Sequence, residues 1–99
     1  MRFKPGISID GVKPELLAGL MVADDIFHRE FKAEMTITAC TDGKHMTGSK
    51  HYTGQAVDIR TRDLSRPEAI MERLNQELDE LYDIVMESDH IHFEYDTHK

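Results

Sequence analysis

Two short stretches of the chain carry the residue types that bind a catalytic metal. The stretch 49–58, SKHYTGQAVD, supplies one imidazole and, seven residues later, one carboxylate. The stretch 87–92, ESDHIH, supplies acidic side chains and two imidazoles. Three nitrogen and oxygen ligands, an open fourth position and a nearby carboxylate to move protons are the components of a catalytic zinc site. The sequence therefore predicts that the fold brings these two stretches together.

The elements that position the two stretches follow from the hydrophobic pattern. Apolar residues at helical spacing predict helices from Pro14 to about residue 31 and from a Ser65–Glu68 capping box to about residue 80. Gly19 in the first helix indicates close packing. Alternating or β-branched runs predict strands, which we place at 35–40, 56–60, 82–87 and 90–95, with a Gly-, Thr- and Ser-rich loop at 41–50.

The order of these elements predicts an α+β fold with a small antiparallel sheet flanked by helices. With 99 residues the chain has room for one domain. We divide it into an irregular N-terminal arm, residues 1–13, in which residues 7–9 form a short extended piece, and a core, residues 14–96. The residues from Asp96 onward are expected to be a short tail.

Composition excludes several classes of function. The net charge of −7, with no basic stretch to offset it, argues against a general nucleic-acid-binding protein. No apolar run reaches the length of a membrane span, and no secretory signal follows the basic N-terminus. We therefore expect a protein made in the cytoplasm without a signal peptide. Separately, we expect a monomer. The lone Cys40 lies in an apolar run and is expected to be a buried thiol.

Strand geometry predicts which polar side chains share a face. If Ser88 and Asp89 form a two-residue turn, Glu87 lies opposite His90 across the hairpin and shares its face. Alternation places His92 on that face too, and turns Asp58 away from its apolar neighbours. Asp89, by contrast, has an ordinary explanation as a turn residue. Any one of these polar residues has a structural explanation, and it is their combination that indicates a site.

The first stretch resembles the Ser-x-His-x-x-Gly-x-Ala-x-Asp motif of the zinc D-Ala-D-Ala peptidases, through Ser49, His51, Gly54, Ala56 and Asp58. This superfamily includes D-Ala-D-Ala carboxypeptidases and dipeptidases, phage L-alanyl-D-glutamate endolysins and murein endopeptidases, and the hedgehog signalling domain shares its fold. The stretch 87–92 resembles the second signature of the superfamily, a Glu shortly before His-x-His. The resemblance covers roughly residues 14–96.

The resemblance implies a zinc site and a role for each residue. His51, Asp58 and His92 would be the Zn²⁺ ligands, and Glu87 the general base that activates water. His90 would stabilise the oxyanion or the departing amine. The implied function is a cell-wall-degrading metallopeptidase, such as a phage endolysin or virion-associated module, that cleaves a peptidoglycan stem peptide containing D-amino acids, acting as a carboxypeptidase or an endopeptidase.

The sequence departs from the superfamily pattern at two points. Some members place the base three residues before the last ligand, which here is Asp89 instead of Glu87. Many also carry a substrate-gripping Arg just after the first core strand. None is present there, and Lys44 or Arg60 are the candidate substitutes, although Lys lacks the bidentate fork of Arg.

Two alternatives therefore stay open. A zinc-stabilised binding module of the hedgehog kind would need the three ligands without catalysis. In the other, the histidines lie on a strand surface and bind no metal. His28, on the first predicted helix, is expected to be a surface or boundary residue and no part of the site.

Overall fold

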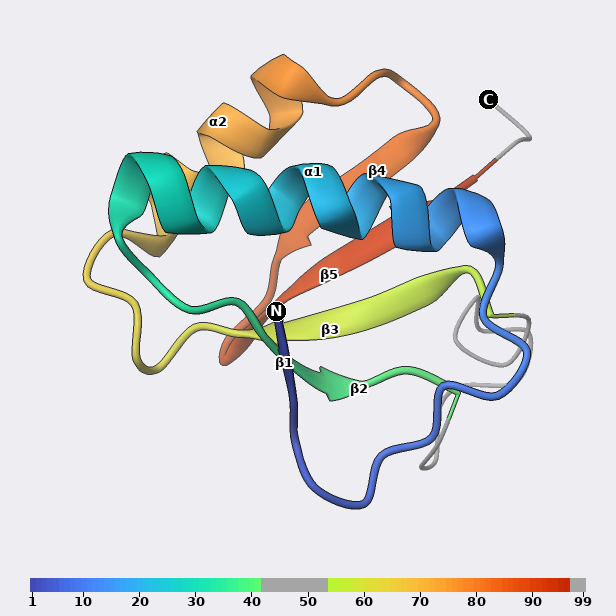
Figure 1. Ribbon diagram of the computed structural model, residues 1–99. Coiled ribbons are helices and arrows are strands. Elements are labelled where there is room, and N and C mark those ends of the chain that lie inside the picture. The colour runs from blue at the N-terminus through green and yellow to red at the C-terminus, as the bar shows by residue number, and fades with distance from the viewer. Residues whose placement is uncertain (42–53, 97–99) are drawn as a thin grey trace.

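A five-stranded sheet carries the polar residues of interest. The computed structural model describes residues 1–41 and 54–96. The strands lie in the order β1-β2-β3-β5-β4 (Figure 1). Their bounds are Arg2–Phe3 (β1), Thr36–Ala39 (β2), Ala56–Arg60 (β3), Tyr82–Met86 (β4) and His90–Tyr95 (β5).

The sheet is mixed, which corrects the prediction of a purely antiparallel one. β1 lies in the segment predicted to be an irregular arm, and it pairs in parallel with β2. The backbone N–H groups of Arg2 and Lys4 donate to the carbonyls of Met35 and Ile37, at 2.8 and 2.9 Å. A two-residue strand is too short to show periodicity in sequence, so pairing with β2, and not local pattern, creates it. Residues 7–9, predicted to be extended, form no strand.

Two helices cover one face of the sheet, α1 (Pro14–Phe31) and α2 (Pro67–Glu77) (Figure 1). α1 begins at the predicted proline. The predicted capping box at the start of α2 is wrong, because Arg66 is the N-cap and no side chain caps the helix. Pro67 sets the start of the helix through its fixed φ and restricts the residue before it, which leaves Ser65 outside the helix.

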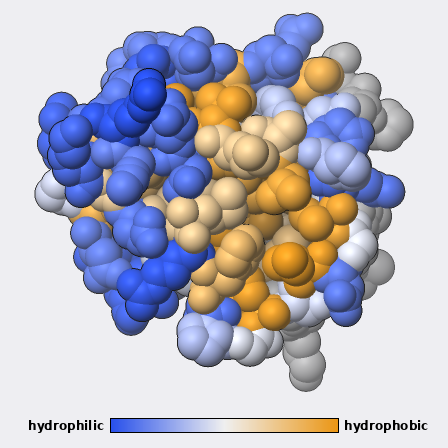
Figure 2. Space-filling view, viewed as in Figure 1, coloured by the Kyte–Doolittle hydropathy of each residue, from blue (hydrophilic) through white to orange (hydrophobic). Residues whose placement is uncertain are grey.

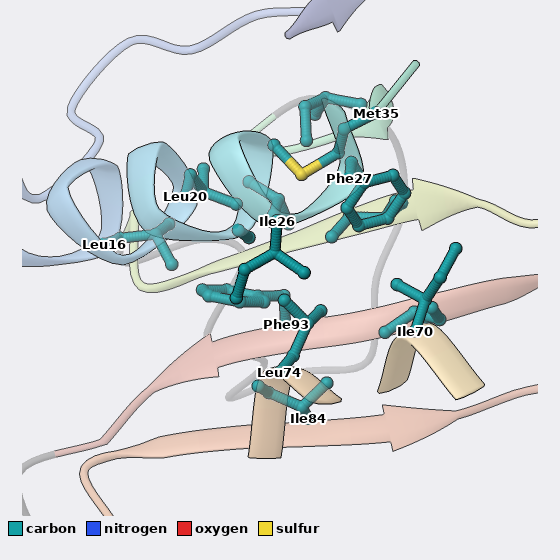
Figure 3. Close-up of a cluster of buried hydrophobic side chains, with 14 of the residues drawn as sticks. Leu16, Leu20, Ile26, Phe27, Met35, Ile70, Leu74, Ile84 and Phe93 are labelled. Atoms are coloured by element: carbon teal, nitrogen blue, oxygen red, sulfur yellow. The ribbon is translucent and has the colours of Figure 1, made fainter. Parts of the chain in front are cut away.

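The core lies between the helices and the sheet (Figure 3). On β3, Val57 and Ile59 are buried, and on β5, Ile91 and Phe93 are buried. The helices contribute buried side chains that include Leu16, Leu20, Phe27, Ile70 and Leu74. Cys40 is also buried, as predicted. Because strand side chains alternate between faces, burying one set of β3 and β5 residues turns the polar set to the face away from the helices.

The outer side of α1 exposes apolar residues as well as polar ones. Leu17, Met21 and Val22 are exposed on this helix, and apolar surface gathers over the middle of the view in Figure 2. His28 is also exposed on α1, as predicted. Within residues 1–41 and 54–96, no helix combines the length and the apolar character needed to cross a membrane.

Gly19 allows α1 to pack closely against β4, as its place in the helix predicted. A Cβ added there would overlap the ring of Tyr82. That ring cannot easily move, because the Tyr82 hydroxyl donates a hydrogen bond to the carbonyl of Glu15, at 2.6 Å. Gly19 therefore sets the distance between α1 and the β4–β5 hairpin.

We expect Gly19→Ala to lower the free energy of unfolding by about 1–3 kcal/mol, since overpacking at a fixed ring outweighs the better helix propensity of Ala. In a Tyr82→Ala background the same change should instead stabilise the protein, by up to about 1 kcal/mol. Urea unfolding of the four proteins measures both effects. An equal effect of Gly19→Ala in both backgrounds would contradict the packing explanation.

Candidate metal and catalytic site

The pairing of β3 with β5 brings the two motifs together. These strands are antiparallel, with Asp58 opposite His92 and Arg60 opposite His90. Residues 34 positions apart in the chain, 58 and 92, thus become direct cross-strand neighbours. Asp58 and both histidines are partly buried on the face away from the helices, so the predicted grouping of these three side chains is confirmed.

The spacing of these side chains suits a shared metal ion. Asp58 Oδ1 lies 3.5 Å from His92 Nδ1 and 3.5 Å from His90 Nε2. These separations exceed the usual hydrogen-bond length of roughly 2.7–3.2 Å. In a tetrahedral zinc site with metal–ligand distances of about 2.0–2.1 Å, two ligand atoms lie about 3.3 Å apart. The Asp58 and His92 atoms therefore fit zinc in both donor type and separation.

The second ring nitrogen of His92 is held by a residue to which the sequence analysis gave no role. Glu94 Oε1 lies 3.0 Å from His92 Nε2. A histidine that binds metal through one nitrogen commonly donates a hydrogen bond through the other to a carboxylate, which fixes its tautomer and orientation. Glu94 thus leaves Nδ1 as the nitrogen that faces Asp58. The His-x-Glu spacing on one strand signals that the two side chains share a face, although it does not by itself predict the contact.

The surrounding carboxylates strongly favour the protonated form of His92. Pairing with Asp58, followed by the hydrogen bond and charge of Glu94, raises the pKa of His92 to about 9, against the opposing effect of burial. A metal ion and a proton compete for the same nitrogen. The site therefore concentrates negative charge where a cation would bind.

Asp89 and Glu87 occupy different positions relative to the histidines. Asp89 Oδ1 lies 2.7 Å from His90 Nδ1, which directs the other ring nitrogen of His90 toward Asp58. The predicted Ser88–Asp89 turn is confirmed, and the Glu87 N–H donates to the His90 carbonyl at 2.9 Å. The Glu87 side chain is exposed and forms no hydrogen bond or ion pair with any residue in the described ranges.

Part of the first motif lies outside the described residues, namely Ser49 and His51, together with the predicted loop and Lys44. The motif glycine, Gly54, is described. Its φ is +75°, and an added Cβ would overlap the backbone of Gly11. The Lys13 N–H donates to the Gly54 carbonyl at 2.9 Å. Gly54 therefore joins the start of β3 to the N-terminal arm, in a backbone conformation that only glycine adopts readily.

A cavity of about 510 Å³ opens beside the Asp58 carboxylate. Side chains from the arm, three strands and two turns line it. They are Lys4, Thr38, Asp58, Arg60, Arg62, Asp89 and His90. Glu87 is not among them. The cavity thus combines the Asp58 and His90 groups with three basic side chains, in a chain that is acidic overall.

A second group of possible ligands lies further along the hairpin. Carboxylate oxygens of Asp83, Glu94 and Asp96 all lie within 4.8 Å of one another. Asp83 and Glu94 are cross-strand partners, which accounts for their proximity. Acidic groups of this kind are common on protein surfaces without a metal, and Glu94 here also contacts His92.

Comparisons with protein-family models, with curated proteins and with solved structures give no match. The likeness to the zinc D-Ala-D-Ala peptidases accordingly rests on the two motifs quoted above. The site geometry does not depend on this resemblance, because the β3–β5 register itself places Asp58 opposite His92.

The raised pKa of His92 makes the stability of the metal-free protein depend on pH. Folding favours the imidazolium, so this stabilisation is complete below pH 6.5, the ordinary pKa, and is lost as pH rises through about 9. The loss should amount to at most roughly 3 kcal/mol. Urea unfolding in the presence of a chelator, from pH 6 to 10, should show a steeper decline in wild type than in His92→Gln, in which the raised pKa of the Met1 amino group, paired with Asp24, still contributes. Parallel curves for the two proteins would contradict it.

The contact between Glu94 and His92 predicts a loss of zinc affinity in Glu94→Gln. The amide leaves the ring less firmly oriented and less basic, so affinity should fall about 10–100-fold. Competition with a chromophoric chelator measures the affinity. Glu72→Gln, which removes an exposed carboxylate from α2, is the matched control and should bind zinc as wild type does. Unchanged affinity in Glu94→Gln would show that the contact does not support the site.

Proposed function

We propose that this protein is a zinc metallopeptidase that hydrolyses a D-amino-acid-containing bond in peptidoglycan stem peptides. The observation that carries the proposal is the position of Asp58 directly across β3–β5 from His92, with ligand atoms at a zinc-compatible separation. The motif resemblance adds His51 as the third ligand, and this residue lies outside the described ranges. A small domain with this activity suits a phage lysin or virion-associated module acting at the bacterial cell wall.

Zinc, when bound by His51, Asp58 and His92, would supply Lewis acidity and lower the pKa of a coordinated water molecule. The remaining work falls to residues of the chain. Glu87 accepts the proton of the attacking water and delivers it to the leaving nitrogen. The carboxylate of Asp89 is already engaged with His90, whereas that of Glu87 has no partner in the described ranges. This difference favours Glu87 as the base.

His90 acts on the substrate side of the site. Its Nε2 faces the Asp58 carboxylate, and its Nδ1 contacts Asp89. In this orientation the ring can donate a hydrogen bond to the oxygen that gains charge during attack. Asp89 is then a positioning residue, which holds the ring in place without touching the reacting atoms.

A second function, a zinc-stabilised binding module without catalysis, is favoured by the position of Glu87. This side chain is exposed and does not line the cavity that contains Asp58 and His90. A binding module needs the ligands but not the base. The two functions therefore differ in what Glu87→Gln does.

The test measures zinc stoichiometry and the release of amines from purified peptidoglycan for wild type, Glu87→Gln and Asp89→Asn. We expect one zinc per chain in all three. Hydrolysis should fall about 10²–10⁴-fold in Glu87→Gln, since the general base is lost, and less in Asp89→Asn, where only the orientation of His90 is weakened. Glu72→Gln is again the matched control.

One zinc with no hydrolysis in any protein would establish the binding module in place of the peptidase. A larger loss in Asp89→Asn than in Glu87→Gln would transfer the role of base to Asp89. Absence of zinc from wild type under metal-replete conditions would contradict the proposal.

A further inference from the structure

The N-terminal half of α1 is apolar on all its sides. Residues 16–23, LLAGLMVA, contain no polar side chain. One set of these residues is buried, namely Leu16, Gly19, Leu20 and Ala23. The other set is exposed on the opposite side of the helix and forms what we call the α1 patch, Leu17, Ala18, Met21 and Val22. A helix that is hydrophobic all round is normally buried all round. The composition of this half of α1 therefore predicts a partner on its exposed side.

The C-terminal half of α1 differs on the same side. Asp25, His28 and Arg29 are exposed there, and Arg29 Nε lies 3.2 Å from Asp25 Oδ1. In Figure 2, apolar surface lies where the N-terminal half of α1 crosses the view, whereas the surface on the left is hydrophilic. The exposed side of α1 thus has an apolar half and a charged half.

We propose that the α1 patch packs against the same patch of a second copy of this chain, with the two helices antiparallel. The four patch residues are spaced evenly about the midpoint between Gly19 and Leu20. A two-fold axis at this midpoint places the apolar residues of one copy against those of the other, which is the condition for a self-complementary interface. Ala18 is small, so it allows the two helices to approach closely.

Charges at the two ends of the α1 patch favour this arrangement over a parallel one. Lys13, the N-cap residue of α1, is exposed and has no side-chain partner within residues 1–41 and 54–96. Lys13 and Asp25 lie at opposite ends of the patch, at almost equal distances from its midpoint. Antiparallel pairing therefore brings Lys13 of each copy to Asp25 of the other, whereas parallel pairing would place like charges together. The exposed pair that Asp25 forms with Arg29 is weak and leaves the carboxylate able to accept a second contact.

The dimer leaves both candidate metal sites open. The helices cover one face of the sheet, and Asp58 and His92 lie on the other, so contact through the exposed side of α1 covers neither site (Figure 1). A stable interface buries about 800 Å² per partner, and half of one helix supplies only part of this area, so we expect a dissociation constant on the order of 100 µM. The expected monomer is then the main form at low concentration.

Sedimentation equilibrium of the full chain, from about 10 µM to about 1 mM, should show a monomer–dimer equilibrium. Met21→Glu should raise the dissociation constant at least about tenfold, because it places two unpaired carboxylates in the centre of the interface. Met21 is exposed in the monomer, so its fold should not depend on this side chain. Val85→Glu makes the same kind of change at an exposed apolar residue of β4 and is the matched control, which should associate as wild type does.

Lys13→Glu and Asp25→Lys test the antiparallel geometry. Each variant alone places like charges opposite one another at both ends of the dimer, so each should associate roughly threefold to tenfold more weakly than wild type. In an equimolar mixture of the two, opposite charges face each other at both ends of a mixed dimer. The mixture should therefore associate about as readily as wild type.

A wild-type chain that stays monomeric at about 1 mM would overturn the proposal. Loss of association in Val85→Glu but not in Met21→Glu would also overturn it, because the contact would then lie on the sheet instead of on α1. If the mixture of the two charge variants associates no better than either variant alone, the antiparallel arrangement is wrong. Loss in Met21→Glu together with recovery in the mixture would support both the surface and its geometry.

Discussion

The antiparallel register between β3 and β5 is the constraint on which the candidate site depends. It places Asp58 opposite His92 and Arg60 opposite His90. A shift of one residue would turn these side chains toward the helices and expose Val57 and Ile59, since strand side chains alternate between faces. The hydrophobic core therefore holds the polar cluster in register, because a one-residue slip that separates Asp58 from His92 also disrupts the packing of the core.

The face of the sheet away from the helices carries both acidic and basic side chains. Carboxylates surround His92 and raise its pKa, whereas basic side chains gather at the Arg60 end of the cavity. A cation fits the first region, and an anion fits the second. Asp89, in the hairpin turn, contacts His90 and also lines the cavity.

Local patterns predicted most of the architecture. The bounds of β3 and β5, the start of α1 at Pro14 and the Ser88–Asp89 turn are as predicted, because alternation, proline and hairpin geometry act locally. β1 was missed, since only pairing with β2 defines so short a strand. The parts of the site that the sequence did not predict also depend on tertiary contacts. Lys4 and Arg62 reach the cavity from separate segments, and the Glu94 contact depends on a side-chain orientation that a face assignment does not give.

The central claim is that Asp58 and His92 hold one zinc ion. A crystal structure of the zinc-soaked protein, with anomalous diffraction data collected on both sides of the zinc absorption edge, tests it most directly. If the two side chains hold zinc, we expect a single strong anomalous peak about 2.0–2.2 Å from an Asp58 carboxylate oxygen and from His92 Nδ1. A peak among Asp83, Glu94 and Asp96 instead, or no peak on the β3–β5 face, would contradict it.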